Sequence, residues 1–457
     1  MKRTSLCAAL LGAAIAAVPL LLQSAPSTQS SATAKKKAAG KPSAKRRRAV
    51  PKPPPVSPQA RAEAAATVES RVRTAPETGI ENAAAMVPLY ELMYRQENHA
   101  ENGQPLRVLQ FGDSHTAADD WPGQLRARFQ QRFGSGGPGF VQAGRPYAGF
   151  RRFDVKSAMS RGWQTLGGIR GGDGFDGIAG VSLAAARAGE TLSLEAEGEV
   201  LEFFYWKQPG GGAFALEDNG SILGEISTEG PAGPGYFRAE LPGGLHSLTL
   251  RTLSGAPVRV FGWVLERRSG ITWETLGLNG AQADLLLKQD AALLKDHIAR
   301  RNPALILIAY GTNESRRKDW TLESYQQALD GVLRLLREAA PVASILVVGA
   351  PDQFIRTRRS AVPPSGTDQI LEAQRRAALE HRCAFWNLRS AMGGPGSMKQ
   401  WVRAGLAQGD YVHLTAAGYR LVGDALYDLI MGQYGIFVSI RSKIMGENGN
   451  GSPLKTH

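Results

Sequence analysis

Cysteine is scarce in this chain of 457 residues, which contains only Cys7 and Cys383. Cys7 lies in an apolar N-terminal segment, so removal of that segment leaves Cys383 alone and excludes an internal disulfide. Neither cysteine has the spacing of a metal site, and no cluster of metal ligands is visible elsewhere. We therefore expect neither a metal nor another cofactor, and any sign of export has to come from the N-terminus.

Acidic residues are missing from the start of the chain, where the first one is Glu63. Residues 1–52 carry eleven lysines and arginines out of a net charge of +13, which leaves 13 − 11 = +2 for the remainder. A nucleic-acid-binding domain is expected to carry its excess positive charge on the folded part. The sequence therefore predicts no specific nucleic-acid partner.

A long apolar run occurs at the N-terminus, where Leu6–Leu22 follows the charged residues Lys2 and Arg3. Small residues at Ser24-Ala25 suit a cleavage site, so we expect residues 1–25 to be a secretory signal peptide. The alternative is an uncleaved membrane anchor, because the run is close to the lower limit of about 17 residues for a spanning helix.

Residues 26–75 have low complexity and are rich in Ala, Ser, Lys and Pro. A segment of this composition buries too little apolar surface to offset the entropy of ordering, which predicts a disordered linker. Its basic residues allow contact with an anionic surface. The alternative is a solvated spacer.

The stretch on which the functional interpretation rests runs from Leu106 to Asp120. Leu106–Phe111 has the apolar character of a buried parallel strand, and Trp121 begins a segment with helical spacing of apolar residues. Ser114 lies in the turn between them. A strand, a sharp turn with a serine and a helix together form an arrangement that holds a nucleophile at the carboxyl edge of a sheet.

The sequence pattern changes over residues 147–267, where short runs of alternating polar and apolar residues, or of aromatic residues, are separated by glycines. This pattern predicts an all-β sandwich inserted into the chain. Strands that alternate with helices return over 268–434, so residues 76–146 and 268–434 are expected to form one discontinuous α/β domain with a parallel sheet. Residues 435–457 are predicted to be a C-terminal tail.

A serine hydroxyl needs a base within hydrogen-bonding reach to become a nucleophile. His413 is the candidate base, because Asp410 lies three residues before it and can hold one imidazole nitrogen while the other faces Ser114. By itself, an Asp-x-x-His turn is more often a helix-capping turn. Its combination with Gly112-Asp113-Ser114 at a strand end favours a catalytic triad.

Acyl transfer also needs hydrogen-bond donors where negative charge develops on the carbonyl oxygen. The candidates are the backbone N–H of Ser114, the backbone N–H of Gly280 and the side-chain amide of Asn313. All three follow predicted strands, so they are expected to meet at one edge of the sheet. In isolation, Gly280 is more often a helix-start glycine and Asn313 a turn residue.

These residues resemble the SGNH (GDSL-like) hydrolases, whose four blocks are matched by Gly112-Asp113-Ser114, Gly280, Gly311-Thr312-Asn313-Glu314 and Asp410-Tyr411-Val412-His413. Two positions depart from the common pattern, because Glu314 stands where many members have Asp and His115 where many have Leu. The resemblance implies a three-layer α/β fold. It also implies a triad of Ser114, Asp410 and His413, with Ser114, Gly280 and Asn313 as the oxyanion hole.

With His115 and Glu314, the first and third blocks are similar to those of a subgroup, the bacterial periplasmic peptidoglycan O-acetylesterases. Members of this subgroup carry a carbohydrate-binding-like domain at the place of the insert. This resemblance implies a periplasmic or secreted monomer that removes O-acetyl groups from N-acetylmuramic acid in the cell-wall glycan. Anchoring to the inner membrane is the alternative if the N-terminal segment is not cleaved.

Three alternatives to this function remain at the level of sequence. The same residues serve an O-acetyltransferase, and the same blocks occur in esterases that act on other acetylated polysaccharides. A non-catalytic wall-binding protein is the third. In the insert, Tyr205 and Trp206 are candidates for stacking on sugar rings, and the alternative is that they are core aromatics.

Overall fold

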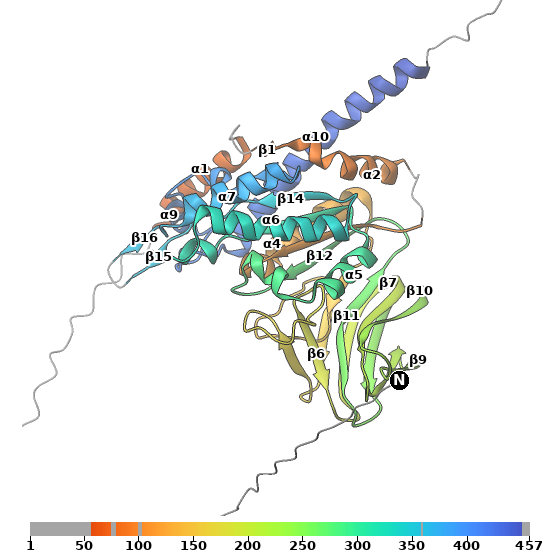
Figure 1. The fold of residues 1–457 in the computed structure, drawn as a ribbon. Coiled ribbons are helices and arrows are strands. Elements are labelled where there is room, and N and C mark those ends of the chain that lie inside the picture. The colour runs from red at the N-terminus through yellow and green to blue at the C-terminus, as the bar shows by residue number, and fades with distance from the viewer. Residues whose placement is uncertain (1–55, 75–78, 99–102, 358–359, 450–457) are drawn as a thin grey trace, which may run out of the picture. The chain divides into compact units, whose positions relative to one another are not determined.

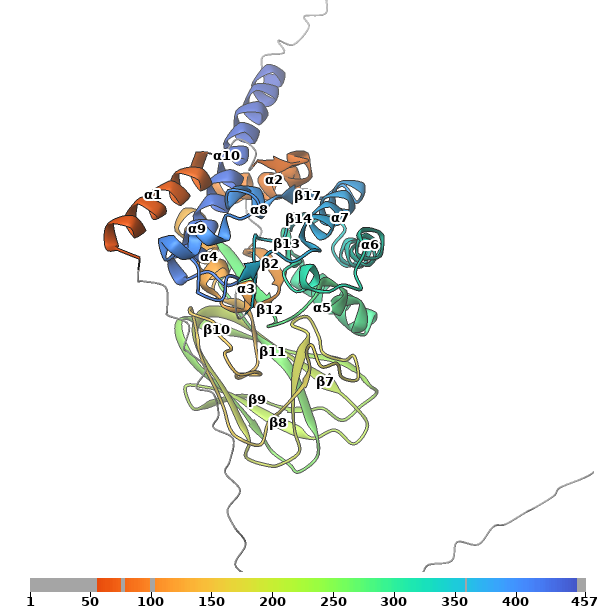
Figure 2. The ribbon, with the colours of Figure 1, turned by 90° about the vertical axis from the view of Figure 1, so that its left-hand side faces the viewer.

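The computed structural model describes residues 56–74, 79–98, 103–357 and 360–449. The predicted signal peptide and most of the predicted linker lie outside these residues. Within them the chain has two large sheets and a set of helices (Figures 1 and 2). None of the helices in this described part has both the length and the apolar character needed to cross a bilayer.

The first sheet has six strands in the order β1-β17-β14-β13-β2-β12, all parallel except β1. Its strands are β1 (Ile80–Glu81), β2 (Leu106–Gly112), β12 (Ile271–Gly277), β13 (Leu305–Ala309), β14 (Ser344–Val348) and β17 (Ala384–Trp386). Short apolar runs in the sequence predict buried strands at 106–111, 304–309 and 344–348, and the structure confirms them to within one residue. β2 lies between β12 and β13, so the loops that follow these three strands are neighbours.

Helices cover both faces of this sheet (Figure 2). One face packs against α1 (Pro58–Thr74), α2 (Val87–Glu97), α4 (Asp120–Phe133), α9 (Met398–Ala404) and α10 (Ala416–Gly449). The other packs against α5 (Ala291–Arg301), α6 (Leu322–Ala339) and α7 (Thr367–Glu380). Successive strand residues such as Val108 and Leu109 enter opposite cores, which is why the strands read as continuous apolar runs.

Short helices complete this region. They are η2 (Ala83–Met86), α3 (Ser114–Ala117), η3 (Ala283–Lys288), η4 (Glu314–Arg316) and α8 (Leu388–Ala391). Thr321 begins α6 with a reciprocal capping box that involves Ser324, as its sequence position predicts. The apolar spacing over 281–298 predicts one helix, but the structure divides this segment into η3 and α5. Asp290 caps α5 by accepting the N–H of Leu293.

The second sheet has nine strands, all of which lie between α4 and β12 in sequence. They are β3 (Gly139–Gln142), β4 (Lys156–Met159), β5 (Gln164–Gly167), β6 (Val181–Ala185), β7 (Thr191–Lys207), β8 (Ala213–Asp218), β9 (Ser221–Ser227), β10 (Gly233–Thr252) and β11 (Val258–Glu266). The sequence pattern predicts two short strands within 191–206 and two within 236–253, but the structure has one long strand in each place, β7 and β10. A small hairpin elsewhere pairs β15 (Ile355–Arg356) with β16 (Ala361–Val362).

This β-rich region has a core of its own, which includes Phe203, Trp263 and Leu250. Its other face shares a core with the α/β region, where Phe204 and Phe261 pack together with Leu276 and Ile298. Strand β3 lies within the segment expected to belong to the α/β domain, but it pairs with β11. The second sheet therefore begins before residue 147.

The structure corrects two predicted boundaries. Residues 58–74, expected to be part of a disordered linker, form α1, because Val68 and Val72 are one helical turn apart and are buried in the core. The predicted tail begins at residue 435, but α10 continues without a break to Gly449. Glu91 helps to hold this extension through an ion pair with Arg441 at 2.8 Å.

Candidate active site

Ser114 lies at the carboxyl end of β2 and is the first residue of α3. Asp113 caps this short helix, since its carboxylate accepts the N–H of His115 at 2.9 Å. The turn is tight because Gly112 has no side chain, and a Cβ there would lie 2.7 Å from the Ala309 carbonyl oxygen. The predicted strand, turn and helix around the serine are thus present.

A chain of hydrogen bonds joins the three predicted triad residues. Ser114 Oγ is 2.9 Å from His413 Nε2, and His413 Nδ1 is 2.7 Å from Asp410 Oδ2. The Nδ1–H donates to the carboxylate, which leaves Nε2 free to accept the serine proton. The structure therefore brings Ser114, His413 and Asp410 together as the sequence predicts.

The loop before α10 holds the acid in place. Asp410 Oδ1 accepts the backbone N–H groups of Val412 and His413 at 2.9 and 3.1 Å, while Tyr411 has the left-handed backbone angle φ of 61° that closes the turn. Burial alone would raise the pKa of Asp410, but the hydrogen bonds from His413 and the two N–H groups lower it below its usual value. Asp410 is therefore ionised at neutral pH.

His115 lies beside the triad without replacing its base. Its ring centroid is 5.5 Å from that of His413, and its Nδ1 is hydrogen-bonded to the Tyr419 hydroxyl at 2.9 Å. Burial lowers the pKa of His115, which keeps the imidazole neutral. His115 thus supports the wall behind the serine.

The predicted oxyanion-hole donors lie on the loops that follow β2, β12 and β13. Among the described residues, no backbone acceptor pairs with the N–H of Ser114 or of Gly280, whose φ of 80° suits glycine. Asn313 Nδ2 donates to the Ala281 carbonyl at 2.9 Å, and its second amide hydrogen is available. That bond places Asn313 against the residue after Gly280.

Glu314 is the main feature whose role the sequence analysis did not identify. Its side chain is fully buried, and it accepts the N–H of Ala283 at 2.9 Å, the N–H of Gly311 at 3.0 Å and the Tyr325 hydroxyl at 3.3 Å. It therefore joins the Gly280 loop to the Asn313 loop. Burial raises the pKa of Glu314 to about 7 against the effect of these N–H groups.

The two aromatic residues predicted to stack on sugars are not placed for that role. Tyr205 and Trp206 are adjacent on β7, so their side chains lie on opposite faces of the sheet, and both faces are covered. Tyr205 packs in the core of the β region, and Trp206 lies 4.8 Å from Phe175 in the shared core. This corrects the prediction in favour of core aromatics.

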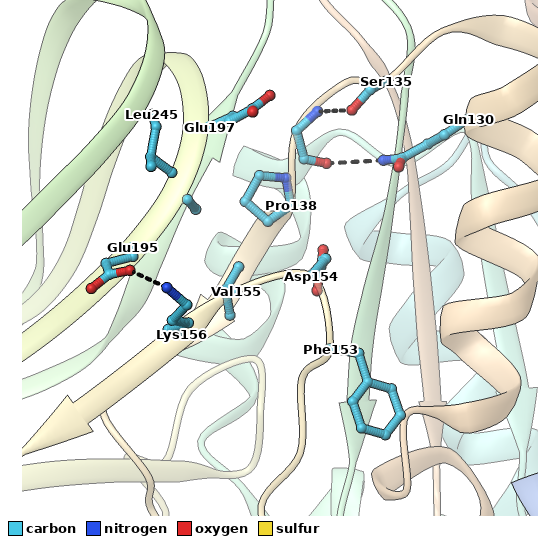
Figure 3. Close-up of a pocket in the computed structure, with 12 residues that line it drawn as sticks. Gln130, Ser135, Pro138, Phe153, Asp154, Val155, Lys156, Glu195, Glu197 and Leu245 are labelled. Atoms are coloured by element: carbon cyan, nitrogen blue, oxygen red, sulfur yellow. Dashed lines mark hydrogen bonds and ion pairs between the residues drawn. The ribbon is translucent and has the colours of Figure 1, made fainter.

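A groove lies outside the triad, between the turn after α4 and the strands β4 and β7 (Figure 3). Its volume is about 340 Å³, and its walls carry Phe153, Asp154, Lys156, Glu195 and Leu245. No group of three or more His, Cys, Asp or Glu side chains arranged for a metal ion occurs among the described residues. The site as described contains the groups of a serine esterase.

Comparison with known proteins supports an esterase of this fold. The model of the GDSL-like lipase/acylhydrolase family matches residues 246–421, a span that contains Gly280, Asn313, Asp410 and His413 but not Ser114. A solved structure described as a peptidoglycan O-acetylesterase in action is 28% identical, with a TM-score of 0.65, and covers 76% of this chain and 96% of its own. The chain has the fold and the esterase groups of the SGNH (GDSL-like) type.

Other solved structures are more distant from this chain. A protein from Bacillus subtilis is 11% identical over 61% of this chain and 90% of its own, with a TM-score of 0.32. A family two carbohydrate esterase from Clostridium thermocellum is 13% identical over 65% of this chain and 99% of its own, with a TM-score of 0.28. No curated protein matches the sequence. The chain is a serine esterase of the SGNH type and resembles the peptidoglycan O-acetylesterases.

Proposed function

We propose that this esterase removes O-acetyl groups from peptidoglycan through an acetyl-Ser114 intermediate. The observation that carries the proposal is the hydrogen-bond chain from Ser114 through His413 to Asp410. It occurs in a chain whose sequence is 28% identical to that of a solved peptidoglycan O-acetylesterase. The apolar N-terminal segment supports action outside the cytoplasm, where this polymer lies.

The reaction follows from the positions of the groups. His413 Nε2 takes the Ser114 proton while Oγ attacks the acetyl carbonyl carbon, and the ion pair with Asp410 stabilises the imidazolium. The N–H groups of Ser114 and Gly280 and the amide of Asn313 bind the negative oxygen of the tetrahedral intermediate. Its collapse breaks the bond to the sugar oxygen, which receives the proton from His413.

Water completes the cycle. His413 deprotonates a water molecule that attacks the acetyl-serine, and acetate leaves as Ser114 regains its proton. No group in this sequence of steps changes its oxidation state, and each proton that His413 takes is returned.

The test of the proposal is acetate release from O-acetylated peptidoglycan, measured beside acetylated xylan. We expect the wild type to prefer peptidoglycan, and Ser114→Ala to lower kcat by about 10⁴-fold or more. Thermal unfolding of the variant should match that of the wild type. Unchanged turnover in Ser114→Ala would exclude the mechanism, and preference for xylan would exclude the substrate.

A further inference from the structure

Phe153 is an aromatic residue exposed to solvent, and its backbone N–H is held by Asp119, which lies five residues after Ser114 in the chain. Its side chain is 62% exposed, and it is the only aromatic among the exposed large apolar side chains of the described residues. Burying such a ring is worth about 1.5–3 kcal/mol, so an exposed ring at a fixed position is available to a ligand. Tyr205 and Trp206, the sugar-stacking candidates from sequence, are both buried.

The residues on either side of Phe153 fix its position. Arg152 is buried and donates to the Phe140 carbonyl at 3.0 Å, to the Pro138 carbonyl, and to Asp154 at 2.6 Å. Arg126, also buried, pairs with Asp154 at 3.1 Å. Phe153 is therefore held on an anchored segment, and presenting its ring to a ligand costs little ordering entropy.

The ring borders the groove shown in Figure 3. The groove carries hydrogen-bonding groups that suit sugar hydroxyl and acetamide groups, namely the carboxylates of Asp154, Glu195 and Glu197 and the ammonium of Lys156, which pairs with Glu195 at 2.8 Å. Leu245, 66% exposed, is a second apolar contact on its wall. The volume of about 340 Å³ lies within the usual range of ligand sites.

A single buried carboxylate connects this segment to the catalytic loops. Asp119 lies two residues after α3, and its Oδ2 accepts the N–H of Phe153 at 2.7 Å. Its Oδ1 accepts the hydroxyl of Thr275 at 2.6 Å, two residues before the end of β12. The groove segment, the Ser114 helix and the strand that leads to Gly280 therefore share one anchor.

We propose that Phe153 and this groove form a subsite for a polysaccharide strand. One sugar face stacks on Phe153, and the next sugars hydrogen-bond to the groove while the acetylated sugar is at Ser114. The subsite rests on the proposed function, because only a polymeric substrate is long enough to contact residues outside the triad. It assigns glycan binding to the junction of the two sheets.

The subsite is tested by measuring kcat and KM of Phe153→Ala, with Ile222→Ala as the matched control. Ile222 is 64% exposed on β9 and does not line the groove. We expect Phe153→Ala to raise KM for O-acetylated peptidoglycan about tenfold at unchanged kcat, and to leave kcat/KM for p-nitrophenyl acetate within about twofold of the wild type, since one lost ring contact is worth about 1–1.5 kcal/mol. Leu245→Ala should act in the same direction, and Ile222→Ala should change neither substrate. An unchanged KM for the polymer in Phe153→Ala, or an equal loss on the small ester, would overturn the subsite.

Binding without turnover separates the subsite from the proposed function. In the Ser114→Ala background, co-sedimentation with peptidoglycan, xylan and chitin gives an affinity that does not depend on hydrolysis. Should the wild type release no acetate from peptidoglycan, the proposed function fails, whereas the subsite stands if Phe153→Ala still weakens binding to one of these polymers. Equal binding of the parent and Phe153→Ala to all three, or no binding by either, contradicts the subsite.

Discussion

Glu314 illustrates how one buried residue organises a site made of separate loops. Its two oxygens accept from Ala283 and Gly311, so one carboxyl group sets the spacing between the loop of Gly280 and the loop of Asn313. The longer Glu side chain in place of the commoner Asp is therefore a structural element of this site. Burial raises the pKa of Glu314 to about 7, with a further increase from the charge of Asp113.

We predict that Glu314→Gln lowers kcat for p-nitrophenyl acetate about tenfold. An amide presents only one accepting oxygen, so either Ala283 or Gly311 loses its acceptor, at a cost of about 1–3 kcal/mol. The measurement is kcat from pH 5 to 8, with the exposed Glu323→Gln as control. Fluorophosphonate labelling of Ser114 should persist in both variants, and wild-type kcat in Glu314→Gln would contradict the role.

The raised pKa of Glu314 also makes the free energy of unfolding depend on pH. Between pH 4.5 and about 7 the folded state binds more protons than the unfolded state, so this group's contribution falls as pH rises through that range. We predict that the free energy of unfolding of the wild type decreases from pH 4.5 to 7 relative to Glu314→Gln. Urea unfolding at several pH values measures this difference, and parallel curves would contradict it.

Sequence predicted that Ser114, His413 and Asp410 meet, because strand ends and an Asp-x-x-His turn are local patterns and parallel strands bring their carboxyl ends to one edge. It did not identify Glu314 as the link between the Gly280 and Asn313 loops. The groups that bind Glu314 include the backbone N–H of Ala283 and the hydroxyl of Tyr325, and neither has a signature in the sequence. It also misplaced Tyr205 and Trp206. Neighbouring residues on a strand lie on opposite faces, and only the packing reveals that both faces of β7 are covered.

At the scale of elements, α3 packs so closely on the ends of β2 and β12 that the residues at these strand ends have no room for a side chain. A Cβ on Gly112 would meet the Thr116 side chain and the Ala309 carbonyl, and one on Gly277 would meet the backbone of Thr116 at 2.7 Å. The helix that carries Ser114 therefore packs directly on two glycines at strand ends.

We predict that Gly112→Ala destabilises the fold by about 1–3 kcal/mol, the usual cost of overpacking, and lowers kcat because α3 must move. Thermal unfolding and p-nitrophenyl acetate hydrolysis measure the two effects. Gly255→Ala is the matched control, since its Cβ would meet nothing within 4 Å. A wild-type melting temperature in Gly112→Ala would show that the turn has room to relax.

Two elements were missed by sequence for reasons of composition. α1 is rich in alanine and arginine and buries few apolar residues, among them Val68 and Val72, so its segment resembles the linker before it. The C-terminal part of α10 has exposed isoleucines at 436, 440 and 444, whose helical spacing lies in the segment predicted to be a tail. For α1, tertiary context, more than local pattern, determines the helix.

At the scale of the whole molecule, a buried ion network joins the two sheets. Arg301 of α5 pairs with Glu266 of β11 and with Glu274 of β12, the latter at 2.5 Å, and Arg107 of β2 pairs with Glu266 at 2.8 Å. Burial would raise the pKa of Glu266, but the two arginines lower it to about 2. The β region and the α/β region are therefore coupled by charge as well as by their shared apolar core.

We predict that Arg301→Met lowers the free energy of unfolding by about 3–5 kcal/mol, because it leaves buried carboxylates without their partner. In the wild type, the folded state binds fewer protons at Glu266 than the unfolded state between pH 4.5 and about 2, so this stability is lost as pH falls through that window. The deficit of the variant should accordingly narrow in acid. Denaturant unfolding measures it, with the exposed pair variant Arg376→Met as control, and an equal loss in both would contradict the network.

The hydrogen bond between Ser114 and His413 joins residues 299 positions apart in the chain. Protein synthesis makes the nucleophile early and its base only near the end, with the whole second sheet produced in between. With the proposed triad as the catalytic one, a growing polypeptide gains esterase activity only when almost all of it exists. Any product truncated before residue 413 retains Ser114 but lacks the base that we propose for it.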